Sequence, residues 1–314
     1  MSKSIGSCFF IVTLFSLHAA NDDGGPLAAR LTGAGSIAAN IRVDVNLTLV
    51  PVSVTDLVGR SVRGLRPQNF QVYDGLRPMP IVSFSSQDQR IAVGLIFDCS
   101  SSMAEKYKTS REAPRELFQQ LNSEDQSFLV TVSDKAELKW PLTSDFDRLQ
   151  NALVFTHPQG TTSLIDGIYL GLREMKKSHN PRKALVVVSD GGDNNSRYSM
   201  RDLGRLVVES DVMIFAVGLY DNPQSSEEEM GPALLSRLTN RTGGANFEVH
   251  NVEELRIAMG RIGVALHNQY VLGYYPPAAP ADGTYRKIKV ELVVPKGTPP
   301  LLVHARAGYY SPKQ

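Results

Sequence analysis

The pattern of hydrophobic and polar residues divides the chain into two outer β segments with an α/β segment between them. Hydrophobic and polar residues alternate strictly over residues 41–49, which is typical of a half-buried antiparallel strand. The dipeptide Asp74-Gly75 is a strong hairpin signal, and residues 81–84 are the predicted return strand. The other strands predicted in the two outer segments are 69–73, 270–275, 285–294 and 301–309.

Between residues 91 and 270 the pattern changes to strands that alternate with helices. The predicted strands are 91–97, 127–132, 184–189, 212–218 and 246–249. The predicted helices are 104–121, 146–155, 164–177, 201–209, 232–239 and 252–267. This alternation implies right-handed crossovers and a mainly parallel sheet with helices on both faces.

These patterns together predict one fold. Each outer segment has a hydrophobic face but too few strands to bury it alone. We therefore predict an α/β domain with a doubly wound, mainly parallel sheet, inserted in a small antiparallel β-sandwich that both termini build. The predicted parts are a signal peptide (1–20), a flexible lead-in (21–40), the first part of the sandwich (41–89), the α/β domain (90–269) and the second part of the sandwich (270–314).

The first twenty residues have the features of a secretory signal. Lys3 provides a positive start, residues 8–17 form an apolar core too short to span a bilayer, and the small residues Ala19 and Ala20 follow. The alternative is a buried N-terminal helix. We expect export, with no transmembrane segment after removal of the signal.

Composition narrows the choice of partners and compartment. The chain of 314 residues is 42% hydrophobic and 21% charged, with a formal net charge of +1, which gives no argument for binding nucleic acid or an anionic membrane. The two cysteines are Cys8 and Cys99, so removal of the signal leaves one thiol and no intrachain disulfide. This composition favours a secreted, periplasmic or cell-envelope protein of a bacterium.

The candidate chemistry begins at the end of the apolar strand 91–97. Asp98, Ser100 and Ser102 follow it at alternate positions. Ligands of open α/β sheets bind beyond the carboxyl ends of strands, so these three side chains can point at one place. A carboxylate and two hydroxyls are hard oxygen donors that suit Mg²⁺, Mn²⁺ or Ca²⁺ and suit Zn²⁺ poorly.

Two further loops are placed to complete a metal site. Residues 160–163 (GTTS) precede the predicted helix 164–177, and a threonine there can provide a hydroxyl ligand. Asp190 follows the buried strand 184–189 in the sequence SDGG. The three loops can therefore converge on one edge of the sheet.

Together, DCSSS, TTS and SDGG resemble the metal-ion-dependent adhesion site of von Willebrand factor type A domains, over roughly residues 90–269. The resemblance assigns the metal ligands Asp98, Ser100, Ser102, Thr162 and Asp190. The segments YVLGYYP and RAGYY further resemble bacterial exported von Willebrand factor A-related proteins. The resemblance implies a non-enzymatic adhesion module that binds a Glu or Asp carboxylate of a partner protein through a divalent cation, most simply Mg²⁺.

The sequence departs from the family pattern at Ser101, at Cys99 in the variable position and at the two adjacent threonines, and it leaves alternatives open. Ser101 replaces a glycine often found between the two serines, and Thr161 beside Thr162 is an alternative ligand. Asp98 and the serines can instead be charges and caps at a helix start. One alternative function is a Mg²⁺-dependent phosphatase that uses Asp98, but such an enzyme needs a second aspartate at the position of Ser100. Another alternative is an interaction scaffold that binds its partner without a metal.

Several neighbouring polar residues receive structural interpretations. Asp166 is an acidic residue of a first helical turn, and Cys99 is a buried thiol. Residues 193–195 form a solvated loop, with a role behind the metal ligands as the alternative. His157 and His267 have no Cys or His companions at metal-binding spacing, so we expect surface or core roles for them.

Overall fold

The computed structural model describes residues 47–220, 226–277, 282–295 and 297–311. The predicted signal peptide, the lead-in and residues 41–46 of the first predicted strand lie outside the described residues. None of the helices in these ranges is long and apolar enough to cross a membrane.

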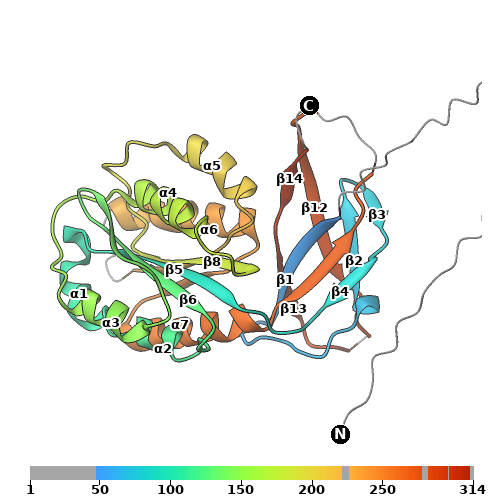
Figure 1. Ribbon diagram of the computed structural model, residues 1–314, viewed down its shortest axis with the longest axis horizontal. Helices are drawn as coiled ribbons and strands as arrows, with labels where there is room; N and C mark the ends of the chain where they lie inside the picture. Colours follow the sequence, from blue (N-terminus) through green and yellow to red (C-terminus); the bar gives the residue numbers. More distant parts are fainter. Residues whose placement is uncertain (1–46, 221–225, 278–281, 296, 312–314) are drawn as a thin grey trace, which may run out of the picture. The chain divides into compact units, whose positions relative to one another are not determined.

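Six strands form a central sheet in the order β10-β9-β8-β5-β6-β7 (Figure 1). Their bounds are β5 (Ile91–Asp98), β6 (Gln126–Val132), β7 (Ala136–Thr143), β8 (Arg182–Ser189), β9 (Met213–Leu219) and β10 (Asn246–Val249). All neighbouring pairs are parallel except β6 and β7. The predicted mainly parallel α/β sheet is confirmed.

Helices cover both faces of this sheet, with α4, α5 and α6 on one side and α1, α2, α3 and α7 on the other (Figure 1). Their bounds are α1 (Ala104–Ser110), α2 (Pro114–Phe118), α3 (Phe146–Val154), α4 (Leu164–Met175), α5 (Met200–Glu209), α6 (Ser226–Thr242) and α7 (Val252–His267), with short 3₁₀ turns η1 (Pro67–Asn69) and η2 (Ser101–Met103). Strand β5 is fully buried because Val93 and Leu95 pack into one core while Ala92 and Ile96 pack into the other.

Three features of this part differ from the sequence prediction. The helix predicted at 104–121 is divided into α1 and α2, because Pro114 has no N–H to continue the helix and instead occupies the first turn of α2. The helix predicted at 232–239 is longer in the structure, where α6 runs from Ser226 to Thr242. Strand β7 was not predicted, although Leu138, Trp140 and Leu142 stand at alternate positions and pack against the two cores.

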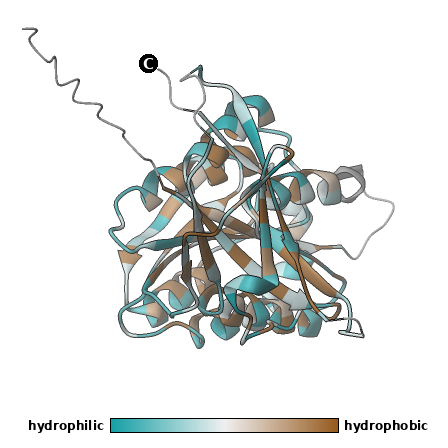
Figure 2. Ribbon diagram, turned by 90° about the vertical axis from the view of Figure 1, so that its right-hand side faces the viewer, coloured by the Kyte–Doolittle hydropathy of each residue, from teal (hydrophilic) through white to brown (hydrophobic). Residues whose placement is uncertain are grey.

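The outer segments form two four-stranded antiparallel sheets that share one hydrophobic core. The sheets have the orders β13-β1-β11-β4 and β14-β12-β2-β3. The bounds are β1 (Thr48–Asp56), β2 (Phe70–Asp74), β3 (Arg77–Met79), β4 (Ser83–Ser85), β11 (Tyr270–Tyr274), β12 (Tyr285–Leu292), β13 (Leu301–Ala305) and β14 (Gly308–Tyr310). Strands of both sheets alternate between hydrophobic and hydrophilic residues (Figure 2), and their buried residues form a single cluster.

Segments far apart in the sequence pair directly in this sandwich. Strand β1 lies between β11 and β13, with Val52 opposite Tyr270 on one side and Ala305 on the other. Strand β2 likewise pairs with β12. The prediction that both termini build one sandwich around the α/β insertion is thus confirmed in its topology, while the exact residue limits of the domains stay a prediction.

The hairpin at Asp74-Gly75 is confirmed, but the prediction of its return strand is wrong. Gly75 and Leu76 close the turn, Gly75 with a left-handed φ of 61°, so the return strand β3 begins at Arg77 opposite Asp74. Strand β4, which overlaps the predicted return strand, pairs with β11 in the other sheet.

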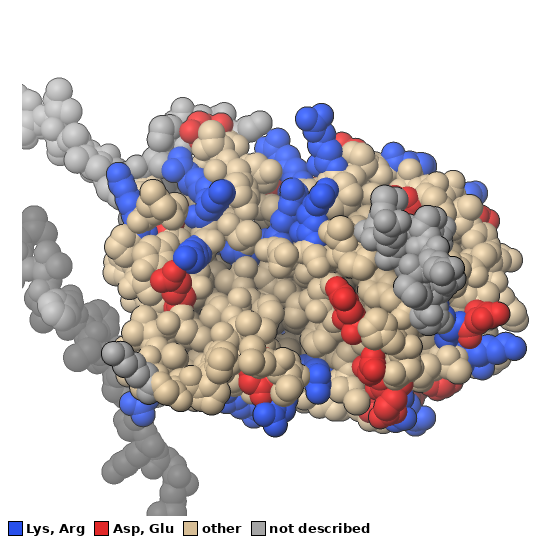
Figure 3. Space-filling model, turned by 180° about the vertical axis from the view of Figure 1, so that it is seen from behind, with Lys and Arg blue, Asp and Glu red and all other residues tan. Residues whose placement is uncertain are grey.

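The surface charge is unevenly distributed although the net charge is close to zero. On the face seen from behind in Figure 3, Lys and Arg side chains gather along one border, and Asp and Glu lie mainly elsewhere.

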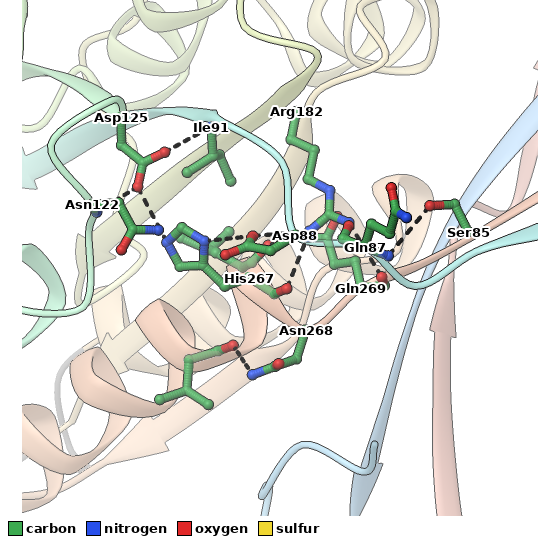
Figure 4. A network of polar contacts seen from close by, with 12 residues as sticks. Ser85, Gln87, Asp88, Ile91, Asn122, Asp125, Arg182, His267, Asn268 and Gln269 are labelled. Carbon is green, nitrogen blue, oxygen red and sulfur yellow. Dashed lines mark hydrogen bonds and ion pairs between the residues drawn. The ribbon is translucent and has the colours of Figure 1, made fainter. Parts of the chain in front are cut away.

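A polar network holds the two connections between the sandwich and the central sheet (Figure 4). The Nδ1 atom of His267 lies 2.8 Å from Oδ1 of Asp88, and its Nε2 atom lies 3.3 Å from Oδ2 of Asp125. Asp125 is fully buried, and its Oδ1 accepts a hydrogen bond from the N–H of Ile91 at 2.8 Å. His267, the last residue of α7, therefore links this helix to the segment before β5 and to the residue before β6, as a structural residue.

This network predicts a pH-dependent contribution to stability. Asp125 raises the pKa of His267, burial opposes this shift, and Asp88 adds to the increase. A histidine with a raised pKa in the folded state stabilises the protein fully below about pH 6.5 and loses this contribution as the pH rises through the folded pKa. We expect His267→Gln to lower the free energy of unfolding by about 1–2 kcal/mol at pH 6 and by less at pH 9.

Urea denaturation between pH 5.5 and 9 measures this difference. The control is His179→Gln, since His179 is exposed. A His267→Gln effect that stays constant over the whole pH range would contradict the prediction.

Candidate metal centre

Asp98 and Asp190 lie at the carboxyl ends of two neighbouring parallel strands. Asp98 is the last residue of β5, and Asp190 directly follows β8, which pairs with β5 up to Val188 opposite Phe97. The apolar runs that form these strands end at the two aspartates, so both carboxylates lie at the same edge of the sheet. Asp98 is 0% exposed and Asp190 is 1% exposed.

The loop after β5 turns the predicted ligands toward each other. Oδ1 of Asp98 accepts a hydrogen bond from the N–H of Ser100 at 2.9 Å, which is an Asx turn. The hydroxyl oxygens of Ser100 and Ser102 lie 3.0 Å apart. Cys99 is 2% exposed, and its thiol donates to the carbonyl of Phe97 at 3.6 Å, so the structure confirms it as a buried thiol.

The threonine loop is tied to the loop after β5. The N–H of Ser101 donates to the carbonyl of Gly160 at 3.0 Å, and the N–H of Gln159 donates to the carbonyl of Cys99 at 2.9 Å. Thr162 is 1% exposed. These bonds hold Thr162 and the DCSSS segment at one end of the sheet.

The same loop is also tied to the segment that follows Asp190. The N–H of Thr162 donates to Oδ1 of Asn194 at 2.9 Å, and its carbonyl accepts from the N–H groups of Asn194 and Asn195, each at 3.0 Å. Oδ1 of Asp193 accepts from the N–H of Ile165 in the first turn of α4 at 3.1 Å. Residues 193–195 thus hold the threonine loop in place. This agrees with the alternative interpretation, in which they support the candidate ligands from behind.

The two adjacent threonines have different environments. Thr161 is exposed, and both its N–H and its hydroxyl donate to Oδ1 of Asp134 at 2.7 Å. Thr162 is buried between the two loops that carry the aspartates. This difference favours Thr162 over Thr161 as a ligand.

Asp166 has the structural role that the sequence suggested. It lies in the first turn of α4 and is 6% exposed. Its Oδ1 accepts from the N–H groups of Arg197 and Tyr198, and its Oδ2 accepts from Nε of Arg197 at 2.9 Å. These bonds account for both carboxylate oxygens of Asp166.

The two buried aspartates form an environment in which a bound cation would be favourable. Burial is the main cause that raises the pKa of Asp98 to about 7, and the negative charge of Asp190 adds to the increase. The hydrogen bonds from Ser189 and Ser100 lower this pKa and so oppose the shift. Oδ1 of Asp190 accepts from the N–H of Gly192 at 3.3 Å, whereas its Oδ2 is buried with no hydrogen-bond partner among the described residues. A buried carboxylate oxygen without a partner is costly, and a cation beside it would remove that cost.

The donor set fits a hard divalent cation. Two carboxylates and up to three hydroxyls are oxygen donors of the kind that Mg²⁺ and Ca²⁺ prefer. In the described part of the chain, no group of three or more His, Cys, Asp or Glu residues could hold a metal ion. The oxygen donors beside the two aspartates in these loops are the serine and threonine hydroxyls of Ser100, Ser102 and Thr162.

Ser189 is a supporting residue that the sequence analysis did not identify. Its hydroxyl donates to Oδ2 of Asp98 at 2.6 Å and accepts from the N–H of Gly191 at 2.9 Å. It thereby joins the first aspartate to the turn that contains the second. The only sequence signal for this role is its position at the end of the strand, directly before Asp190.

A close approach of two glycines fixes the loop of Asp190. Gly191 has a left-handed φ of 83°, and a Cβ atom placed on Gly231 of α6 would lie 2.1 Å from the carbonyl oxygen of Asp190. The main chain of α6 therefore packs directly on the candidate ligand loop.

Gly231→Ala is therefore expected to destabilise the protein by about 1–3 kcal/mol, because either the helix or the loop has to move. Gly260→Ala in α7 is the matched control, since its Cβ atom would meet only Cβ of Glu116 at 3.9 Å. A small stabilisation is expected for the control, because alanine restricts the unfolded chain. Equal free energies of unfolding for both variants in urea would contradict the close approach.

Comparisons with known proteins agree with the fold of the α/β domain. Residues 93–192 match the family model described as the von Willebrand factor type A domain. The solved structure of a von Willebrand factor type A protein from Catenulispora acidiphila is 14% identical, with a TM-score of 0.52, and the match covers 85% of this chain and 63% of that chain. This similarity supports the fold alone. No curated protein sequence matches the chain.

Two other solved structures show weaker similarity. The vWF domain of the type V pili tip protein Mfa5 from Porphyromonas gingivalis is 11% identical, with a TM-score of 0.47, covering 56% of this chain and 95% of that chain. Proximal thread matrix protein 1 from the mussel byssus, with a zinc-occupied MIDAS motif, is 17% identical, with a TM-score of 0.47, covering 62% of this chain and 49% of that chain. Residues 93–192, which include Asp98 and Asp190, thus match the von Willebrand factor type A domain model, and the fold of the described residues agrees with that match.

Proposed function

We propose that this chain is a non-enzymatic, exported adhesion module that binds a partner protein through a divalent cation. The proposed ligands are Asp98, Ser100, Ser102, Thr162 and Asp190. The observation that carries the proposal is the pair of buried aspartates, one of which has a carboxylate oxygen without a hydrogen-bond partner among the described residues. When bound, the cation would supply positive charge and a coordination position open to a ligand from outside.

The chain's own residues hold this arrangement before a cation binds. Ser189 and the N–H of Ser100 orient the carboxylate of Asp98, and Asn194 orients Thr162. Such positioning lowers the cost of ordering the ligands at the moment of binding. Neutral hydroxyls leave the cation with only two negative ligands, so we infer that a Glu or Asp carboxylate of the partner is the preferred outside ligand.

We take Mg²⁺ as the cation, with Mn²⁺ and Ca²⁺ as alternatives, because all the donors are oxygens. We place the protein outside the bacterial cytoplasm, either secreted or in the cell envelope. This assignment rests on the N-terminal signal pattern of the sequence.

The proposal is tested with glutarate as a probe for a carboxylate ligand, followed by NMR chemical-shift changes in the ¹⁵N-labelled protein. We expect shifts of amides near Asp98 and Asp190 with glutarate in the presence of Mg²⁺, and none in EDTA. Glutaramide, which has the same shape without the charge, is the matched control. Equal binding of glutarate in Mg²⁺ and in EDTA would refute the proposal in favour of a metal-free scaffold.

A phosphatase assay distinguishes the adhesion proposal from the enzymatic alternative. The position two residues after Asp98 holds Ser100, which lacks the carboxyl group that a second catalytic aspartate would supply. We expect no hydrolysis of p-nitrophenyl phosphate with Mg²⁺. Turnover that disappears in Asp98→Asn would replace the adhesion proposal with a hydrolase.

A further inference from the structure

A cavity of about 550 Å³ lies at the opposite edge of the central sheet from the candidate metal centre. It is lined by the first residues of β8 and β9, whereas Asp98 and Asp190 lie at the other ends of the parallel strands. The remaining lining comes from α5, the end of α6, and strands β1, β11 and β14 of the sandwich. Its volume lies in the usual range for sites that bind small molecules.

One part of the cavity lining is apolar. Val207 and Val208 of α5, followed by Val212 and Met213, are each at least 91% buried. At the start of β1, Leu49 remains 48% exposed although it lines the cavity. An apolar chain placed there would be removed from water and would cover this leucine, which favours binding.

The rest of the lining is strongly cationic. Four basic residues line the cavity, namely Arg182, Lys183, Arg241 and Arg306. Asp211 is the single acidic residue in the lining. Asp211, which adopts a left-handed φ of 51°, is paired with the guanidinium group of Arg306. Arg182 has an ion pair with Asp88, which lies outside the cavity lining, at 3.8 Å. Lys183 and Arg241 are therefore the lining basic residues without a carboxylate partner among the described residues.

Several donors around the cavity lack good acceptors. The Nε atoms of Arg182 and Arg306 are buried and have no hydrogen-bond partner among the described residues. Arg182 is 6% exposed, so this N–H is withheld from water. The amide of Gln269, which is 5% exposed, donates to Sδ of Met213 at 3.5 Å, and a thioether is a weak acceptor.

We propose that this cavity binds a small anionic amphiphile, with a carboxylate or phosphate head among the basic residues and an apolar tail along α5 and β1. An oxyanion would balance the excess positive charge, because arginine donors match the oxygens of both head groups. The site is separate from the metal centre and does not depend on the proposed adhesion function.

The test uses the full mature chain in EDTA, titrated calorimetrically with dodecanoate, dodecyl phosphate and dodecyltrimethylammonium below their micelle concentrations. We expect saturable binding of one molecule of either anion, with a Kd in the micromolar range, and no binding of the cation. Equal binding of the cation, or no binding of either anion, would overturn the proposal. Binding to phosphatidylglycerol vesicles without binding of the monomeric anions would overturn it in favour of a lipid surface.

Variants locate the binding in this cavity. Lys183→Met removes one positive charge and should weaken dodecanoate binding about fivefold or more. Leu49→Asp places a negative charge on the apolar wall and should weaken it more than tenfold. The control Leu76→Asp lies in the β2–β3 turn, where the side chain is 98% exposed, and should bind as wild type does. Wild-type affinity in both cavity variants would overturn the assignment.

Discussion

Replacing Asp98 or Asp190 by Asn is expected to abolish the increase in thermal stability that Mg²⁺ gives to the wild-type protein. A ligand that binds only the folded state stabilises it by about 2.7 kcal/mol when its concentration is 100 times its Kd. In the wild type we expect this gain to come from a cation beside two buried carboxylates, one of which has an oxygen without a hydrogen-bond partner in the described part of the chain. An amide has no negative charge, so either variant should lose the response to Mg²⁺.

The substituted proteins are expected to stay folded in EDTA. Burial and the charge of Asp190 raise the pKa of Asp98 to about 7, so two buried negative charges oppose each other at pH 8. Replacing either carboxylate removes this repulsion. The loss of the Mg²⁺ response therefore reports on ligand binding and is not a consequence of unfolding.

Thermal denaturation with Mg²⁺, Mn²⁺, Ca²⁺ and EDTA measures this prediction. Asp134→Asn is the matched control, because Asp134 is a carboxylate of the neighbouring loop that binds Thr161. It should retain the full response. Thr162→Val should lose most of the response and Thr161→Val should keep it. A full Mg²⁺ response in Asp98→Asn would contradict the ligand assignment.

The position of the candidate site was predictable because its main signals are local. An apolar run that ends in a carboxylate indicates a buried strand with a ligand at its carboxyl end, and this holds for both Asp98 and Asp190. Parallel strands then bring the two residues to one edge. By contrast, the roles of Ser189 and Asn194 depend on partners 91 and 32 residues away, which no local pattern indicates.

The fold was predictable to a similar depth. The alternation in the outer segments gives each strand one hydrophobic face that has to be buried, and these faces form the core of the sandwich. The pairing of β4 with β11 was missed because three residues carry little pattern, and the proximity of the turn at Gly75 suggested a local return. The choice between Thr161 and Thr162 likewise required Asp134, whose position is set by the tertiary structure.

Arg182→Met is expected to lower the free energy of unfolding by about 3 kcal/mol. The guanidinium group donates to the carbonyls of Leu266 and His267 through Nη1, each at 3.3 Å, and to those of Gln87 and Gln269 through Nη2, at 2.6 and 3.3 Å. Figure 4 shows this group between the two connections that lead into and out of the α/β domain. Methionine fills similar volume but donates no hydrogen bond, and each buried carbonyl left without a donor costs about 1–3 kcal/mol.

Two substitutions control for size and charge. Arg182→Lys keeps the charge but has a smaller head group, and it should recover part of the lost stability. Arg60→Met removes an exposed ion pair with Asp56, where the arginine side chain is 75% exposed, and should cost less than about 1 kcal/mol. A loss below about 1 kcal/mol for Arg182→Met in urea would contradict the role of this side chain.

The same variant should also change how the protein unfolds. The sandwich core is separate from the two cores of the central sheet, and Arg182 binds both connecting segments, so its loss should weaken the coupling between them. The single tryptophan, Trp140 in β7, reports only on the α/β domain, whereas far-UV circular dichroism reports on all the strands. We expect the two signals to coincide in the wild type and to separate in Arg182→Met, because unfolding is then no longer two-state. Coincident transitions in both proteins would show that contacts other than those of Arg182 couple the sandwich to the α/β domain.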